Sequence, residues 1–343
     1  MRDLSHLNTP NGSSQVAAGA AVLASAVTGF WLLLLPVFHG DPSIYLIYAR
    51  NTAAGLPFTF NPGEFSSGST SILWPLILAP AHVALGPIAA AYASKTIALL
   101  LGIVAVTGLY VLYRRVSSSP IHGLVVALAV VSLALGDLVM LYESPLTLLC
   151  LVALLLLCHT HPEPSLEDRG WLLGIAACWS ALAMCRPELV MVGVIHAALL
   201  LRFVWRRAPT GVARLAALLF VAMVPAALYY MYSMRVTGFA SVSGAARRAF
   251  LGTVETDLGA VLGSLLLSTR GWVVIALAVV AFVGIRAGRL AHVEKLAAAL
   301  VTAQVFVYTV VAPLTEIGYL SRYLLTGLVC LGVLAARGLS ADR

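Results

Sequence analysis

Apolar segments of membrane-spanning length recur along almost the whole chain, and this feature constrains the fold more than any other. An α-helix needs about 20 predominantly apolar residues to cross a bilayer. Of the 343 residues, 61% are hydrophobic and 10% are charged, whereas soluble domains carry about 25% charged residues. Such a chain cannot cover itself with a soluble surface. We therefore expect an all-α, polytopic integral membrane protein.

Ten apolar runs qualify as membrane helices once their flanking residues are included. They cover residues 16–38, 94–113, 121–140, 145–158, 171–184, 189–204, 213–231, 271–285, 296–313 and 323–336. A less hydrophobic stretch, 39–70, and a run interrupted by proline and glycine, 72–93, lie between the first two. Both residue types are unfavourable inside a helix. We therefore expect residues 39–93 to form an external loop with amphipathic, interfacial helices.

Arginine residues set the orientation of the bundle. If 72–93 does not span, the arginines at the helix ends face the cytoplasm, as the positive-inside rule requires; they are Arg114, Arg115, Arg206, Arg207, Arg286, Arg289 and Arg337. Residues 1–15 then form a disordered cytoplasmic tail. Residues 16–338 form a single transmembrane domain, with no separate soluble domain. This topology accounts for the net charge of +7, so we expect no nucleic-acid partner.

The same topology gathers polar side chains on the external face. Eight of the fourteen acidic residues lie on or near it: Asp41, Glu64, Asp137, Glu143, Glu188, Glu255, Asp257 and Glu316. Ionisable groups at membrane depth are costly unless they line a site. We therefore expect the functional site on this face.

Four sequence segments resemble the GT-C-type membrane glycosyltransferases, in particular the arabinofuranosyltransferase branch. The most specific is the first external loop, GDPSIYLIYARNTAAG…FNPGEFSSGSTSILW, followed by LYESPLTLL, MCRPELVM and SRYLLTGLVCLGVLAARGL. One departure is clear, because Gly40 stands where the family has the first of two adjacent acids. The resemblance implies a GT-C-like fold and an enzyme of the plasma membrane. It would transfer a sugar from a polyprenyl-phosphate monosaccharide to a glycan, lipid or protein acceptor, on the external face and with inversion.

Asp41 is the candidate catalytic residue. The resemblance implies that it is the general base on the acceptor hydroxyl, whose proton must leave as the new bond forms. From the residues alone, Asp41 can also be the N-cap of a short amphipathic helix over 43–54, with Pro42 in the first turn. The two roles are compatible.

The other candidates are either basic or pocket-lining residues. For the donor phosphate they are Arg322, Arg186 and Arg50, because arginine supplies fixed donors and a permanent charge; Arg247 and Arg248 are next in line. For the acceptor or pocket they are Glu143, Glu188, Tyr45, Tyr48 and Thr70. Simpler interpretations remain open: interface anchoring for the two tyrosines, helix-dipole complementation for Glu143 and Arg50, and mutual neutralisation of Arg186 and Glu188.

Metal and cofactor chemistry is not expected. The five cysteines lie in apolar stretches without a CxxC pair, and the HxH pattern of His159 and His161 has no acidic partner in helical register. Two other functions would suit the same composition: a lipid or sugar transporter, and a non-catalytic subunit of a glycosylation complex. A transporter predicts inverted repeats with broken helices, and the sequence contains no internal repeat. Loss of the first acid at Gly40 favours the non-catalytic subunit.

Overall fold

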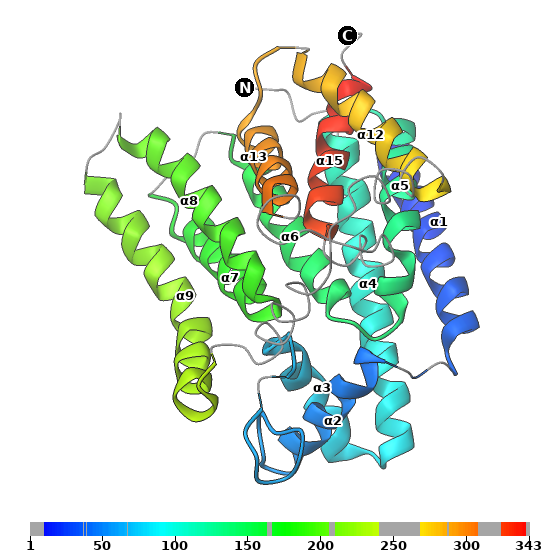
Figure 1. Cartoon of the computed structure of the whole chain (residues 1–343). Helices are drawn as coiled ribbons and strands as arrows, with labels where there is room; N and C mark the ends of the chain where they lie inside the picture. Colours follow the sequence, from blue (N-terminus) through cyan, green and yellow to red (C-terminus); the bar gives the residue numbers. More distant parts are fainter. Residues whose placement is uncertain are drawn as a thin grey trace.

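The computed structural model is an all-helical bundle, as the sequence predicts. It describes residues 10–36, 38, 40–66, 68–162, 167–205, 210–239, 268–286, 288–307 and 324–340. Ten helices of the described part match the ten predicted runs (Figure 1): α1 (Pro10–Leu34), α4 (Pro87–Ser117), α5 (Pro120–Val139), α6 (Ser144–Thr160), α7 (Arg169–Cys185), α8 (Val190–Trp205), α9 (Thr210–Thr237), α12 (Thr269–Arg286), α13 (His292–Phe306) and α15 (Leu325–Gly338). Six of them, α1, α4, α5, α8, α9 and α12, are long and apolar enough to cross a membrane. The multi-pass prediction is thereby confirmed.

Helix α4 lies at the centre of the bundle, where it packs against α1, α5, α6 and α15. Glycine residues allow the backbones of α12 and α15 to approach each other closely. A Cβ added to Gly284 would meet the carbonyl oxygen of Leu334, and one added to Gly338 would meet that of Val280. Membrane helices use such glycines because packing, rather than the hydrophobic effect, holds them together in lipid.

A buried lysine joins the end of α1 to α4. The ammonium of Lys95 donates to the carbonyl oxygens of Leu34 and Leu35 at 2.5 and 2.9 Å. It also lies 4.3 Å from the ring centroid of Phe38. The last carbonyls of a helix have no partner within the helix and carry partial negative charge. Lys95 therefore acts as a tertiary cap for α1, although it belongs to another helix.

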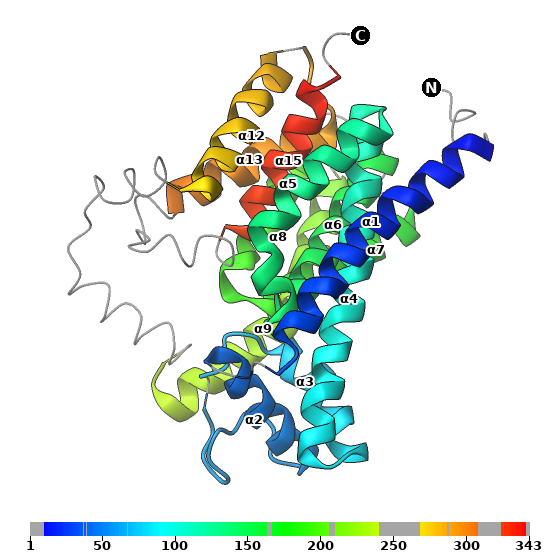
Figure 2. The ribbon, with the colours of Figure 1, turned by 90° about the vertical axis from the view of Figure 1, so that its right-hand side faces the viewer.

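Two shorter helices, α2 (Asp41–Ala53) and α3 (Leu73–Ala84), lie side by side at one end of the bundle (Figures 1 and 2). Helix α2 matches the predicted amphipathic helix to within two residues at each end. The expected boundary of the next membrane helix is wrong, since α4 begins at Pro87 rather than at residue 94. Proline is well suited to the first turn of a helix, so Gly86 and Pro87 separate α3 from α4, whereas Pro75 and Pro80 are accommodated within α3. Likewise, α1 begins at Pro10, inside the expected polar tail.

Candidate functional site

Four segments that are distant in the sequence meet at the end of the bundle that carries α2 and α3. They are α2, the loop that follows it, the α5–α6 connection and the α7–α8 connection. Two hydrogen bonds fix this arrangement: the indole of Trp74 donates to the carbonyl of Leu141 at 3.0 Å, and the amide of Ile72 donates to the carbonyl of Met184 at 2.9 Å. The start of α3 is thus hydrogen-bonded to the α5–α6 connection and to the end of α7.

Five of the predicted site residues form one continuous polar network, which we call the Glu143–Arg186 network. The hydroxyl of Tyr45 lies 2.6 Å from Oε2 of Glu143 and 2.6 Å from the hydroxyl of Thr70. A phenol has a single proton; since Tyr45 donates it to Glu143, the Thr70 hydroxyl donates to Tyr45. Nη1 of Arg186 lies 3.4 Å from Oε1 of Glu143, and its Nε lies 2.6 Å from Oε1 of Glu188.

The network is buried and carries more acid than base. The side chain of Glu143 is 0% exposed, that of Arg186 5% and that of Glu188 27%. A buried ion is costly unless it is paired and hydrogen-bonded, and here both carboxylates converge on one guanidinium. The formal charge of these three groups is −1. Such an arrangement holds the arginine fork in one orientation and presents carboxylate oxygens that can accept protons or hydroxyl hydrogen bonds.

Two other candidates lie near the network without joining it. The Tyr48 hydroxyl donates to Oγ of Ser66 at 2.8 Å and accepts from the amide of Gly68 at 3.0 Å, so it organises the loop after α2. Interface anchoring is the wrong interpretation for both tyrosines, because Tyr45 and Tyr48 are each only 1% exposed. Arg50 is exposed in the last turn of α2, where it bonds Oδ1 of Asn51. That position fits helix-dipole complementation.

The proposed base, Asp41, is the first residue of α2 and lies one helical turn before Tyr45. Gly40 rather than Asp41 is the N-cap of α2, with φ of 71°, so the capping interpretation of Asp41 is wrong. A left-handed backbone conformation favours glycine, which gives a structural reason for glycine at this position, where the glycosyltransferases that the sequence resembles have an acid. The Asp41 side chain lies outside the described part of the structure, as do the whole of Arg322, Arg247 and Arg248.

A cluster of aromatic side chains from α9 and the loop after α2 covers that loop, and the sequence alone does not predict it. The ring centroids of Phe58 and Tyr229 are 5.0 Å apart, and those of Phe65 and Tyr232 are 4.8 Å apart. The neighbouring Tyr230 lies close enough to Glu188 to interact with its charge. The signal was present in the sequence as the tyrosine-rich end of α9, but only the tertiary structure brings it to the network.

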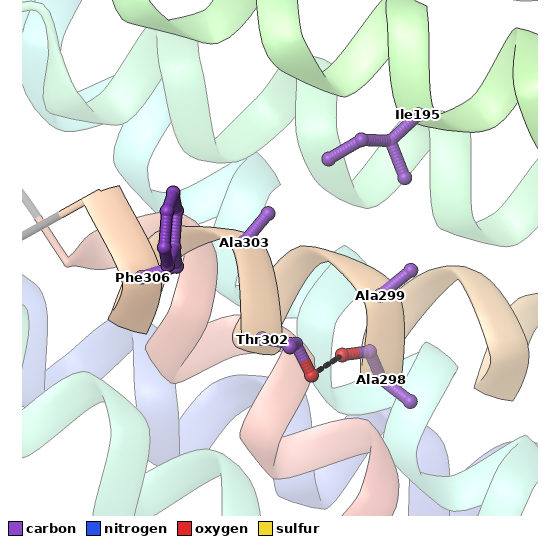
Figure 3. Close-up of a pocket in the computed structure, with 6 residues that line it drawn as sticks. All are labelled: Ile195, Ala298, Ala299, Thr302, Ala303 and Phe306. Carbon is purple, nitrogen blue, oxygen red and sulfur yellow. Dashed lines mark hydrogen bonds between the residues drawn. The ribbon is translucent and has the colours of Figure 1, made fainter. Parts of the chain in front are cut away.

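An apolar groove lies between α8 and α13 (Figure 3). Its volume is about 550 Å³, and it is lined by Ile195, Ala298, Ala299, Thr302, Ala303 and Phe306. Its one hydroxyl, on Thr302, donates to the carbonyl oxygen of Ala298 at 2.9 Å. The groove therefore offers hydrocarbon rather than hydrogen-bonding groups to an occupant.

Comparison with known proteins identifies the architecture. No family of known proteins matches the sequence, and no curated protein is similar to it. The structure is similar to that of ArnT from Cupriavidus metallidurans bound to undecaprenyl phosphate, with a TM-score of 0.67 and 15% sequence identity. The alignment covers 96% of this chain and 60% of the ArnT chain, so the protein spans about three fifths of that neighbour. The chain therefore has the GT-C-like fold of ArnT.

Proposed function

We propose that the protein transfers a sugar from a polyprenyl-phosphate monosaccharide to a glycan, lipid or protein acceptor at the external face of the plasma membrane. The Glu143–Arg186 network carries this proposal, because buried polar groups from four segments meet at one end of a GT-C-like bundle. The undecaprenyl phosphate bound to ArnT supports the class of donor. We place residues 16–338 in one transmembrane domain, with the 39–93 segment outside the membrane.

In the proposed reaction, the acceptor oxygen attacks the anomeric carbon while Asp41 takes its proton. The bond from that carbon to the phosphate oxygen breaks, and the lipid phosphate leaves with both electrons of the bond. Attack from the side opposite the leaving group inverts the anomeric centre. Asp41 is suited to the base role by its place in the chain, at the start of α2 and one turn from Tyr45.

We assign the donor phosphate to Arg186 and Arg322. A guanidinium matches the geometry of phosphate oxygens, and its charge stabilises the leaving group. Glu143 and Glu188 position Arg186, which lowers the cost of ordering it when the donor binds. In this proposal, the acceptor binds next to the hydroxyls of Tyr45 and Thr70 and to the loop that Tyr48 organises. Arg50, which is exposed in the last turn of α2 and close enough to His82 of α3 to interact with it, is the third candidate for the donor phosphate.

The apolar groove is suited to the hydrocarbon chain of the donor. Helix α8 follows directly on Glu188, and Ile195 lies seven residues further along it. With a rise of 1.5 Å per residue, the groove therefore begins about 10 Å from the network along the helix. A donor with its phosphate at Arg186 would direct its chain along this apolar surface.

The test is sugar transfer by membranes that contain the wild-type protein or Asp41→Asn. A panel of radiolabelled polyprenyl-phosphate pentoses and hexoses serves as donor, and incorporation into lipid-linked and polymeric acceptors is measured. Because asparagine keeps the size of aspartate but cannot take the proton, transfer should fall ~100-fold or more. Glu64→Gln is the matched control, since Glu64 is an exposed acid of the same loop and should keep full activity.

Two outcomes would contradict the proposal. Full transfer by Asp41→Asn would remove the base assignment. Absence of transfer by the wild-type protein with every donor of the panel would favour the non-catalytic subunit or the transporter.

A further inference from the structure

A second cluster of reactive side chains lies far from the Glu143–Arg186 network. Cys158 is near the end of α6, His196 is on α8, and His292 is the first residue of α13. One potential ligand atom from each lies within 4.8 Å of the other two. Cys158 is fifteen residues after Glu143, about 22 Å along α6, and His196 is eight residues after Glu188, about 12 Å along the chain. The sequence does not predict this meeting, because the three residues are distant in the chain.

We propose that Cys158, His196 and His292 form a binding site for Zn²⁺. Thiolate sulfur and imidazole nitrogen are the ligands that this borderline-soft ion prefers. In a tetrahedral site with ordinary Zn–S and Zn–N bonds, neighbouring ligand atoms lie about 3.3–3.6 Å apart. Here Sγ of Cys158 is 3.5 Å from Nε2 of His196, and that Nε2 is 3.0 Å from Nε2 of His292. The spacing between Cys158 and His196 already fits, the two imidazoles need to separate by a few tenths of an ångström, and Cys158 and His292 are within 4.8 Å of each other.

Trp179 controls which nitrogen of His196 carries the proton. Its indole N–H donates to Nδ1 of His196 at 3.3 Å, so Nε2 carries the proton in the metal-free protein and donates it to Nε2 of His292. Zn²⁺ binding at Nε2 moves this proton to Nδ1, where it faces the indole N–H. The thiol of Cys158 loses its proton to solvent as the Zn–S bond forms. Because two N–H groups then face each other, Trp179 weakens the binding of Zn²⁺ to His196 and makes the ion easier to exchange.

Bound Zn²⁺ would join three helices at one point. Helix α13 contributes His292 and, two turns later, Ala299 of the apolar groove, whereas α8 contributes His196 and the adjacent Ile195. An ion at the triad would hold α13 against α8 next to this groove. The HxH pattern of His159 and His161 is not part of the proposed site: His161 instead pairs with Asp168 at 3.3 Å, and its ring lies 5.6 Å from that of Trp171.

The experiment uses the full chain, purified in detergent and titrated with Co²⁺ as a spectroscopic substitute for Zn²⁺. We expect one Co²⁺ per protein, with a near-ultraviolet thiolate-to-cobalt band that Zn²⁺ abolishes by displacement. Cys158→Ser should lose the band, and His292→Ala should bind at least tenfold more weakly, since each removes one of three ligands. Zn²⁺ should raise the Tm of the wild type by about 5 °C and leave that of Cys158→Ser unchanged.

Three further variants keep the proposal falsifiable. Cys178→Ser and His161→Ala remove a neighbouring thiol and a neighbouring imidazole outside the triad, and both should keep the band. Trp179→Phe should bind Co²⁺ about fivefold more tightly, because the opposing donor is gone. The proposal is overturned if the wild type gives no thiolate band, if the band survives in Cys158→Ser, or if Cys178→Ser abolishes it. Correct folding of each variant is checked by circular dichroism and size-exclusion chromatography, and Cys158→Ala replaces Cys158→Ser if the latter misfolds.

Discussion

Within the described part of the chain, two buried arginine–glutamate clusters lie at opposite ends of the bundle, and they are built differently. At one end, Arg186 is shared between Glu143 and Glu188, and Glu143 also accepts from Tyr45. At the other end, Arg337 pairs with the single acid Glu294 at 2.7 Å. The first cluster has an extra negative charge, whereas the second is neutral.

The partners of the two arginines also differ in kind. Arg337 donates to the carbonyl oxygens of Gly284 and Arg289, and Glu294 accepts the amide of Ala291 at 2.6 Å. From the last turn of α15, the second cluster therefore satisfies backbone groups at the end of α12 and at the start of α13, which is a structural task. In the Glu143–Arg186 network, side chains bond to side chains. A cluster that closes helix ends is expected to contribute stability, and one that joins loop side chains is expected to serve a site.

The largest effect is expected from removal of each arginine. Arg186→Ala leaves Glu143 buried without its counter-ion, so the free energy of unfolding should fall by about 3–5 kcal/mol, and transfer per folded molecule should fall ~100-fold. Arg337→Ala should lower the Tm as well, yet leave transfer per folded molecule within about twofold of wild type. Both are measured by tryptophan fluorescence on heating and by the transfer assay. If transfer fell equally in the two variants, the assignment of a functional role to one cluster and a structural role to the other would be wrong.

The next effect concerns the acids. Glu143→Gln keeps the shape of the side chain but removes the charge that faces Arg186 and Tyr45. Charge-assisted hydrogen bonds contribute about 1.5–3 kcal/mol, so transfer should fall about 10- to 100-fold. Glu294→Gln should lower the Tm alone. Normal transfer by Glu143→Gln would mean that the Glu143–Arg186 network has only a structural role.

A smaller effect is expected from a single hydroxyl. Tyr45→Phe leaves Glu143 and Thr70 without a shared partner, and transfer should fall about tenfold. Tyr113→Phe is the matched control, because Tyr113 is equally buried and donates to the carbonyl of Val329 at 2.8 Å. It should cost about 1 kcal/mol of stability and no activity. Transfer measured beside thermal unfolding separates the two outcomes.

Glu188→Gln should have the smallest effect. Glu188 is 27% exposed, so water screens its interaction with Arg186, and about 1 kcal/mol or less is expected. Transfer should fall only about two- to fivefold. A loss as large as that of Glu143→Gln would mean that Glu188 contacts the substrate directly.

Much of the candidate site could be identified from the sequence because charged residues are rare in this chain. Glu143, Arg186 and Glu188 stand out between apolar helices, where an ionisable group needs a partner or a function. Their pairing could not be predicted, since residues 98 positions apart, such as Tyr45 and Glu143, follow no helical spacing. The exposed position of Arg50 was equally hidden, because the periodicity of α2 alone does not say which face packs on α3.

By itself, the sequence determined the class of the protein: an all-helical membrane bundle with ten apolar helices and an amphipathic helix in the first loop. Hydrophobicity and helix-breaking residues act over a few turns, so they can be read locally. Only the tertiary structure decided that Gly40 is the N-cap of α2, that Glu143 shares Arg186 with Glu188, and that Cys158 meets His196 and His292. These contacts depend on how helices pack and cross, which is the sum of many small interactions along their whole length.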